Sequence, residues 1–118
     1  MYKSWCALFV MFFLVSSCSH GEKHTPNPYE QDIPSEPKVH TVEIKQMKFD
    51  PAEIKVRRGD KVVWINHDIL VHDITEETSK AWTSSALPVG ASWSMTVTKS
   101  SAYYCSIHVV MKGKVIVE

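Results

Sequence analysis

Close to the C-terminus, residues 103–111 (YYCSIHVVM) place a thiol, an imidazole and a thioether three residues apart, at Cys105, His108 and Met111. A thiolate and an imidazole with a weak thioether nearby are the ligands of copper electron-transfer sites, when a second imidazole comes from elsewhere in the chain. The alternative is a strand end in which Cys105 is a small core residue and Met111 fills a gap. A metal site therefore needs another histidine and a rigid β framework from the rest of the sequence.

The N-terminus has the pattern of an export signal. Lys3 precedes an apolar run from Trp5 to Val15, which is followed by two serines and Cys18. This pattern predicts a signal peptide over residues 1–17, because the run is shorter than the roughly 20 apolar residues of a membrane-spanning helix. Residues 15–18 also resemble a bacterial lipobox. That resemblance implies cleavage before Cys18 and lipidation of its thiol; the alternative is a plain signal peptide cut nearby.

The cysteines support a metal-binding role for Cys105. Cys6 leaves with the signal peptide and Cys18 receives the lipid, so Cys105 has no disulfide partner within its own chain. A lone thiol outside the cytoplasm is open to oxidation unless something uses it, which favours ligation over packing. We expect the protein to be in the periplasm or at the cell surface, lipid-anchored to a bacterial membrane.

Residues 18–37 form the predicted tether between the anchor and a folded domain over residues 38–118. The segment is polar, holds Pro26, Pro28, Pro34 and Pro37, and has almost no aliphatic side chain, so it cannot build a core. His20 and His24 lie in it. We interpret them as solvated linker residues rather than ligands.

The predicted domain is all-β. Runs with alternating or β-branched residues predict strands, and no stretch has a helical period. These runs are Val39–Ile44, Ile54–Val56, Lys61–Asn66, Val71–Thr75, Trp93–Val97, Ala102–Cys105 and Lys114–Val117, with Lys112 and Gly113 at a bend. Glu76 to Leu87 is predicted to be a long loop with at most one helical turn. Strands of this length separated by turns indicate a β-sandwich or barrel. The formal net charge is zero and the basic residues are scattered, which argues against a nucleic-acid-binding protein.

Three histidines remain as candidates for the missing imidazole: His40 on the first strand, His67 in a turn, and His72. Here the sequence resembles a family. The motifs MKFDP (residues 47–51), Gly59-Asp60 and WINHD (residues 64–68) leading to His72 resemble small bacterial cupredoxins, the type 1 blue copper proteins. Residues 105–111 look like the ligand loop of that family in its short form.

The resemblance implies a cupredoxin-like Greek-key β-sandwich of about seven to eight strands. In the family the first histidine ligand follows the strand tryptophan by eight residues, which from Trp64 gives His72 and leaves His67 on the surface. The implied cofactor is one type 1 copper ion with His72, Cys105 and His108 as trigonal ligands and Met111 as a long axial ligand. Zinc sites usually carry more cysteines, and a binuclear copper site needs a second cysteine in the loop.

Asn66, Asp68, Asp73 and Ser106 are the polar residues nearest to these ligands in the sequence. Asp73 stands where cupredoxins often have an asparagine that fastens the two ligand loops together. We expect Asp73 to bond the Ser106 hydroxyl or backbone, and its charge to favour Cu(II) and lower the reduction potential. The alternative is a solvated aspartate at a strand end.

Proline is frequent in the family at the positions of Val71, Ile107 and Val109, so these residues leave backbone N–H groups that need partners. With Leu70 and Val110 they give His108 an apolar surround. By resemblance, redox partners dock on such a patch; the alternative is that these side chains pack the end of the sandwich.

The resulting prediction is a monomeric one-electron carrier whose donor and acceptor proteins dock near His108. It is not an enzyme, because four protein ligands leave no open copper position for a substrate. The alternatives are a protein that delivers copper to another factor and a metal-free β-sandwich adhesin.

Overall fold

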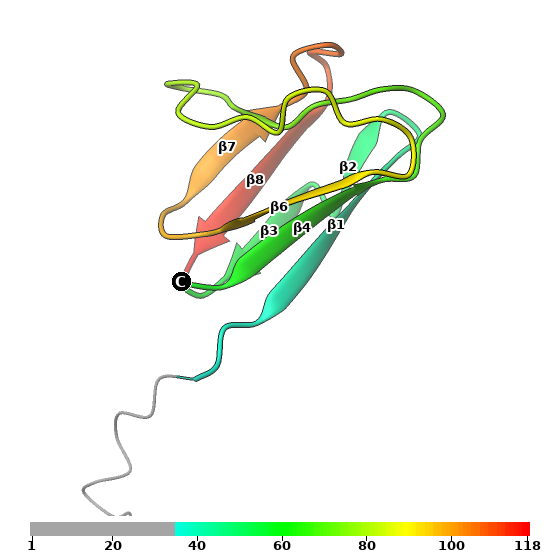
Figure 1. Ribbon diagram of the computed structural model, residues 1–118. Helices are drawn as coiled ribbons and strands as arrows, with labels where there is room; N and C mark the ends of the chain where they lie inside the picture. The colour runs from blue at the N-terminus through cyan, green and yellow to red at the C-terminus, as the bar shows by residue number, and fades with distance from the viewer. Residues whose placement is uncertain (1–34) are drawn as a thin grey trace, which may run out of the picture. The chain divides into compact units, whose positions relative to one another are not determined.

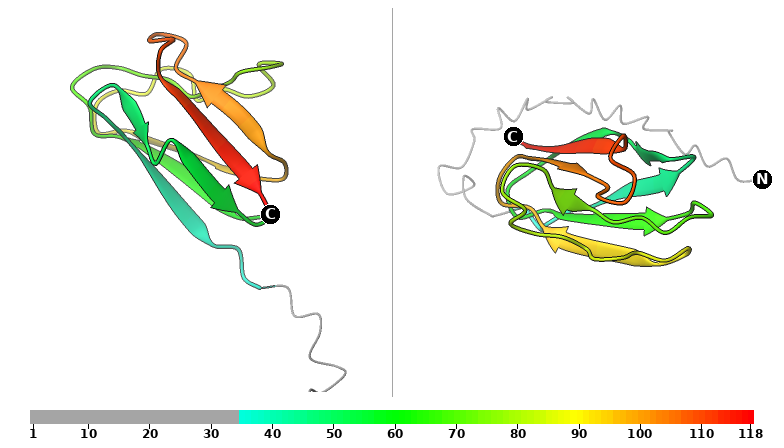
Figure 2. Two further views of the ribbon diagram at one scale, coloured as in Figure 1. Left: turned by 180° about the vertical axis from the view of Figure 1, so that it is seen from behind. Right: turned by 90° about the horizontal axis from the view of Figure 1, so that it is seen from above.

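The computed structural model describes residues 35–118, and its strands form two four-stranded sheets packed face to face (Figures 1 and 2). One sheet has the order β2-β1-β4-β6 and the other β3-β8-β7-β5. The strands are β1 (Val39–Lys45), β2 (Lys48–Asp50), β3 (Glu53–Val56), β4 (Lys61–Asn66), β5 (Thr75–Glu76), β6 (Ser92–Thr96), β7 (Ser101–Tyr104) and β8 (Lys112–Val117). The all-β sandwich expected from the sequence is confirmed.

Strand β4 shows why this sequence forms these sheets. Val62, Trp64 and Asn66 are buried, while the residues between them are exposed or half-buried. This alternation is what a strand with one face on the core requires. β4 pairs parallel with β1 and antiparallel with β6, so it lies in the interior of its sheet.

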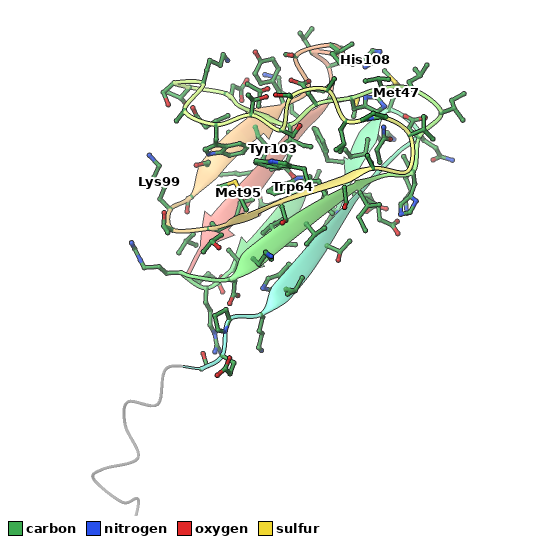
Figure 3. The ribbon with its side chains drawn as sticks, in the orientation of Figure 1. Met47, Trp64, Met95, Lys99, Tyr103 and His108 are labelled. Atoms are coloured by element: carbon green, nitrogen blue, oxygen red, sulfur yellow. The ribbon has the colours of Figure 1, made fainter. Side chains whose placement is uncertain are left out.

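The core lies between the two sheets and is centred on two aromatic residues. The ring of Trp64 on β4 meets the ring of Tyr103 on β7 edge to face, with centroids 5.4 Å apart (Figure 3). Trp82 and Trp93 extend this cluster toward the surface, at 6.3 and 5.4 Å from Trp64. A core of large aromatic side chains fixes the distance between the two sheets. It therefore also fixes the relative positions of the strand ends, from which the loops extend.

Some strand boundaries differ from those expected. The strand expected at Val71–Thr75 is reduced to β5, preceded by a single bridge between His72 and Leu87. Lys112 and Gly113 begin β8 instead of forming a bend, and β2 was not anticipated. Residues 77–87 form a loop without a helical turn.

The predicted signal peptide, the anchor at Cys18 and most of the tether lie outside the described residues. Residues 35–38 are exposed and lead into β1 at the end of the sandwich opposite to the loop 105–111 (Figure 1). No helix in residues 35–118 is long and apolar enough to cross a membrane.

A buried carboxylate fastens the start of β1 to the turn before β4. Asp60 accepts hydrogen bonds from the backbone N–H of Lys38 at 2.8 Å, from the His40 ring at 2.8 Å and from the backbone N–H of Arg57 at 3.0 Å. These bonds, with that of Lys38 the largest, lower the pKa of Asp60 from 3.8 to about 2.

A second buried carboxylate organises the loop that follows β5. Glu76 accepts hydrogen bonds from the Ser79 hydroxyl at 2.7 Å and from the backbone N–H groups of Thr78 and Ser79 at 2.9 and 2.6 Å. These donors, led by the Ser79 hydroxyl, lower the pKa of Glu76 from 4.5 to about 2.

These two carboxylates predict an acid-sensitive fold. Both bind a proton less readily in the folded than in the unfolded chain, so their contribution to stability is complete above pH 4.5 and is lost as the pH falls toward about 2. We expect the free energy of unfolding of the metal-free protein, measured by urea denaturation, to fall across this range. In the Asp60→Asn, Glu76→Gln double variant the free energy of unfolding should fall distinctly less over the same pH range. A pH dependence equal to that of the wild type would contradict the prediction.

Candidate metal centre

Two loops at one end of the sandwich carry the candidate ligands. The segment between β4 and β5 supplies His72, and the loop between β7 and β8 supplies Cys105, His108 and Met111; Figure 3 labels His108 at this end. Within the second loop, the Cys105 N–H donates to the Met111 carbonyl at 3.1 Å and the Met111 N–H to the His108 carbonyl at 2.9 Å. These backbone bonds hold the three side chains in a closed turn.

The side chains of His72, Cys105 and His108 converge on one point. The two Nδ1 atoms lie 3.2 Å apart, and the Cys105 Sγ lies 3.7 Å from Nδ1 of His72 and 3.9 Å from Nδ1 of His108. In the described part of the chain they form the one group of three or more candidate metal-binding His, Cys, Asp or Glu side chains. The structure thus brings together three residues that the sequence separates by up to 36 positions.

This triangle has the size of a trigonal metal site. A first-row metal bound to thiolate and imidazole at about 2.0–2.3 Å, with ligands 120° apart, gives ligand separations of about 3.5–3.7 Å. The separations seen here are close to these values. Two imidazoles and one thiolate, with Met111 buried in the same loop, are the donor set of a type 1 copper site. The residues therefore fit one copper ion.

The centre is closed to solvent on all sides but one. His72 and Cys105 are fully buried and Met111 is 2% exposed, whereas His108 is half-buried. The ring of His108 is thus the ligand that reaches the surface.

Asp68 orients His72. Its Oδ2 lies 2.9 Å from Nε2 of His72, and both side chains are buried. The carboxylate selects the tautomer with the proton on Nε2, which leaves the lone pair of Nδ1 directed at Cys105 and His108. Hydrogen bonds from the Met47 and Ile69 N–H groups hold the carboxylate in place. The Met47 bond is the largest of several causes that lower the pKa of Asp68, against the opposing effect of burial.

Asn66 fixes the loop that carries His72. Its buried side-chain amide donates to the carbonyls of Leu70 and Leu87 at 2.8 and 2.9 Å, and its carbonyl accepts the Asp68 N–H at 2.9 Å. All three bonds are to backbone groups near the ligands, and none is to a ligand side chain. Asn66 therefore supports Asp68 and, through it, His72.

Asp73 joins the two ligand loops. Its carboxylate accepts the Ser106 N–H at 2.6 Å and the Ser106 hydroxyl at 2.7 Å, so both bonds expected from the sequence are present. Asp73 is 5% exposed, which rules out the alternative of a solvated strand end. Burial acts to raise the pKa of Asp73, but hydrogen bonds from Thr75, Ser106 and Cys105 outweigh it and the pKa lies below its ordinary value.

The surroundings of Cys105 act on its thiol in two directions. Burial raises its pKa, and the Asp73 carboxylate adds to this effect. The backbone N–H groups of Asp73, His108 and Ile107 oppose it by favouring the thiolate. The Asp73 N–H lies 3.4 Å from Sγ. The Ile107 N–H would be missing if this position held the proline that is frequent in the family.

Six exposed apolar side chains lie on the two loops that carry the ligands. The residues expected in a docking patch are all exposed rather than packed into the sandwich: Leu70 (44%), Val71 (42%), Val109 (61%) and Val110 (81%). Ile107 and Ile69 are exposed as well, at 51% and 85%. We call these six residues the apolar patch.

The remaining histidines of the domain lie elsewhere. His67 is exposed, as expected, and His40 pairs with Asp60 at the other end of the sandwich. The contact between Asp68 and His72 was not anticipated, although a carboxylate four residues before a ligand was a usable indication. The bond from the Thr75 hydroxyl to Asp73 and the contact of the Thr83 hydroxyl with that of Thr75 were not anticipated either.

The comparisons with known proteins agree with this geometry. Residues 37–118 match the family model described as copper binding proteins, plastocyanin/azurin family. Amicyanin from Paracoccus denitrificans is 31% identical over 83 residues, which cover 65% of this chain and 63% of that protein. The match thus spans less than two thirds of that relative's length. Amicyanin from Paracoccus versutus is 27% identical over 93 residues, which cover 74% of this chain and 69% of the relative.

Solved structures are similar over the same region. The Cu(I) form of a mutant amicyanin superposes with a TM-score of 0.64 at 30% identity, covering 68% of this chain and 82% of that one. A copper-containing nitrite reductase from Thermus scotoductus gives a TM-score of 0.62 at 26% identity, but only 22% of its chain is covered. The likeness to the reductase is therefore confined to one part of a larger protein.

Proposed function

Because the chain belongs to the plastocyanin/azurin family of copper-binding proteins, we propose that it is a one-electron carrier that holds a single type 1 copper ion through His72, Cys105, His108 and Met111. The observation that carries the proposal is the convergence of the Cys105 Sγ and two imidazole Nδ1 atoms within 3.9 Å of one another. Asp68 supports it by directing the lone pair of His72 to that point.

Bound copper supplies a Cu(II)/Cu(I) couple that accepts or releases one electron. The chain's contribution is to keep the ligands in one arrangement for both oxidation states. Asn66 and the backbone bonds of the loop 105–111 fix the ligand positions, and the burial of His72 and Cys105 excludes water. With four donors present, no position is left for a substrate, which favours a carrier over an enzyme.

The apolar patch, which lies on the two loops that carry the ligands, is the proposed docking surface for a donor and an acceptor protein. Its six side chains carry no charge, and its most exposed members are 81% and 85% accessible. Exposed apolar surface of this kind is typical of interaction sites. His108, the one half-buried residue among the three converging side chains, gives a route from the surface to the buried thiolate. Copper delivery, the alternative, requires ligands that an acceptor can reach, and only His108 is accessible among the three converging residues.

We further propose that Cys18 carries a lipid anchor and that residues 18–37 tether the domain outside the cytoplasmic membrane. The entry of residues 35–38 at the end opposite to His108 supports this arrangement, because a tether there leaves the apolar patch free for partners (Figure 3).

Adding Cu(II) to the purified protein tests the proposal. We expect an intense visible thiolate-to-copper charge-transfer band that saturates at one equivalent, and copper that stays bound through cycles of reduction and reoxidation. The His67→Ala variant, which removes an exposed histidine outside the site, should behave identically. Absence of the band, or complete loss of copper to an apo-acceptor on reduction, would overturn the electron-carrier function.

A further inference from the structure

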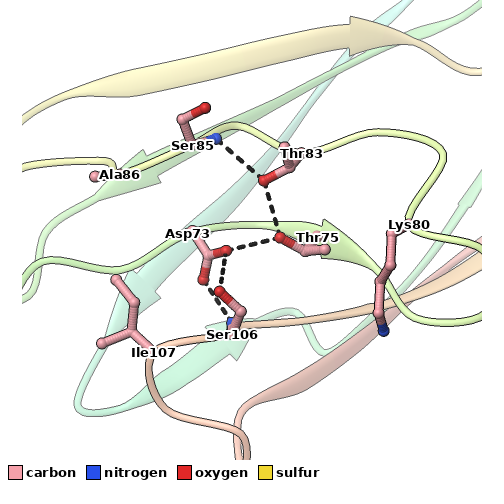
Figure 4. Close-up of a pocket in the computed structure, with 8 residues that line it drawn as sticks. All are labelled: Asp73, Thr75, Lys80, Thr83, Ser85, Ala86, Ser106 and Ile107. Atoms are coloured by element: carbon pink, nitrogen blue, oxygen red, sulfur yellow. Dashed lines mark hydrogen bonds between the residues drawn. The ribbon is translucent and has the colours of Figure 1, made fainter.

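Asp73 is an acidic residue held between the two ligand loops, directly after His72 and in contact with Ser106, the neighbour of Cys105. Figure 4 shows its carboxylate among the residues that line an open pocket, whose volume is about 420 Å³. The side chain itself is 5% exposed. A carboxylate buried this close to a thiolate ligand calls for an explanation, because an amide of the same shape would tie the loops together as well.

The hydrogen bonds around Asp73 fit an ionised carboxylate. Its oxygens accept from the Ser106 N–H at 2.6 Å, the Ser106 hydroxyl at 2.7 Å and the Thr75 hydroxyl at 2.7 Å. The Thr75 hydroxyl has one hydrogen, which it donates to Asp73. In its contact of 2.9 Å with Thr83 it therefore accepts, and the Thr83 hydroxyl donates. The N–H of Ser85 then donates to Thr83 at 3.1 Å. Every donor in this series of hydrogen bonds is directed toward Asp73, which is the arrangement that an ionised, acceptor-only carboxylate requires.

The charge of Asp73 is not balanced by a neighbouring cation. No lysine or arginine within residues 35–118 forms an ion pair with it. Lys80 lines the same pocket, but its Nζ donates to the Glu77 carbonyl at 2.6 Å and lies over the Tyr104 ring at 4.3 Å. The hydroxyls of Thr75 and Ser106 and the Ser106 N–H thus stabilise the carboxylate by hydrogen bonds alone, and its field extends toward the metal centre.

We propose that Asp73 is a positioning residue that lowers the reduction potential of the copper site through its fixed negative charge, with Thr75 and Thr83 holding the carboxylate in place. The inference rests on the proposed function. A nearby negative charge stabilises Cu(II) more than Cu(I), because the oxidised ion carries one more positive charge. The weak screening expected for a buried group makes this preference larger than that of a surface carboxylate.

The Asp73→Asn variant separates charge from structure. The asparagine carbonyl can still accept the Ser106 N–H, and its amide can donate to the Ser106 and Thr75 hydroxyls, which are able to accept. We expect about a tenfold shift in preference toward Cu(I). For one electron a tenfold change corresponds to a rise of about 59 mV in the potential measured by voltammetry. Independently, competition titrations should find Cu(II) binding about tenfold weaker and Cu(I) binding nearly unchanged.

Two further variants act as controls. Glu77→Gln removes a charge that is paired with Lys112 near the surface and should leave the potential near that of the wild type. Thr75→Val keeps the Asp73 charge but removes one of the hydrogen bonds that hold the carboxylate, so it should raise the potential by distinctly less than Asp73→Asn. An unchanged potential in Asp73→Asn, or an equal rise in Thr75→Val, would overturn the inference. If the wild type lacks the charge-transfer band, the proposed function itself fails; a normal band with an unmoved potential removes only the role of Asp73.

Discussion

Replacing Cys105 with serine is expected to abolish the intense visible band completely and to weaken Cu(II) binding severely. The band arises from electron donation by the thiolate, and a serine hydroxyl neither ionises under these conditions nor offers a soft sulfur ligand. Cys105 is fully buried, and serine has nearly the same shape. The fold should therefore survive, with a loss of about 1–3 kcal/mol for burying a hydroxyl. Visible spectroscopy and a copper competition titration measure the first effect, and urea denaturation of the metal-free protein the second.

The matched control uses another cysteine of the same chain. Cys18→Ser should leave the band and the copper affinity unchanged, because the predicted role of Cys18 is lipid attachment. Persistence of an intense band in Cys105→Ser would contradict the assignment of the thiolate ligand. Loss of the band in Cys18→Ser would instead assign that cysteine to the metal.

The parts of the fold that follow from local sequence were predictable. β4 has the bounds that the sequence predicted, Lys61–Asn66. Its buried face must be apolar, and this requirement leaves an alternating pattern in the sequence that can be recognised. The ligand loop was predictable too, since Cys105, His108 and Met111 lie within seven residues and their chemistry limits the metal. His72 needed the resemblance to a family, because no local rule prefers it to His67.

Gly113 illustrates what the sequence could not supply. It had the pattern of a bend, yet it lies in β8, where a Cβ would come within 2.3–2.5 Å of the Tyr103 ring. The glycine is thus required by a side chain from the neighbouring strand β7, not by its own backbone conformation. The hydrogen bonds that Asp68 accepts from the Met47 N–H and that Asp73 accepts from the Ser106 N–H likewise join segments that lie far apart in the sequence.

The tuning of the site also depends on such long-range contacts. The Asp73 N–H, which lies 3.4 Å from the Cys105 Sγ, withdraws electron density from the thiolate and favours the reduced ion, while the Asp73 carboxylate favours the oxidised ion. One residue therefore acts in both senses through its backbone and its side chain. The Asp73→Asn variant isolates the carboxylate because it leaves the backbone N–H in place.

Removing the carboxylate of Asp68 is expected to weaken copper binding about 10- to 100-fold. The Asp68 Oδ2 lies 2.9 Å from Nε2 of His72 inside the protein, and in Asp68→Ala that N–H loses its acceptor. The imidazole is then free to adopt the other tautomer or to rotate, so the Nδ1 lone pair is no longer held toward Cys105. Competition titrations with Cu(I) and Cu(II) chelators measure the loss, which should affect both oxidation states because the geometry of the ligand changes rather than the local charge alone.

The structure provides a matched control in a second histidine–aspartate pair. His40 and Asp60 are joined at 2.8 Å at the opposite end of the sandwich, and Asp60 also accepts two backbone N–H groups, as Asp68 does. Asp60→Ala should therefore destabilise the fold to a similar degree while leaving the copper affinity at the wild-type value. If both variants weaken copper binding equally, general destabilisation explains the effect and Asp68 has no specific role. If only Asp68→Ala does so, the tautomer and orientation of His72 are set by this carboxylate.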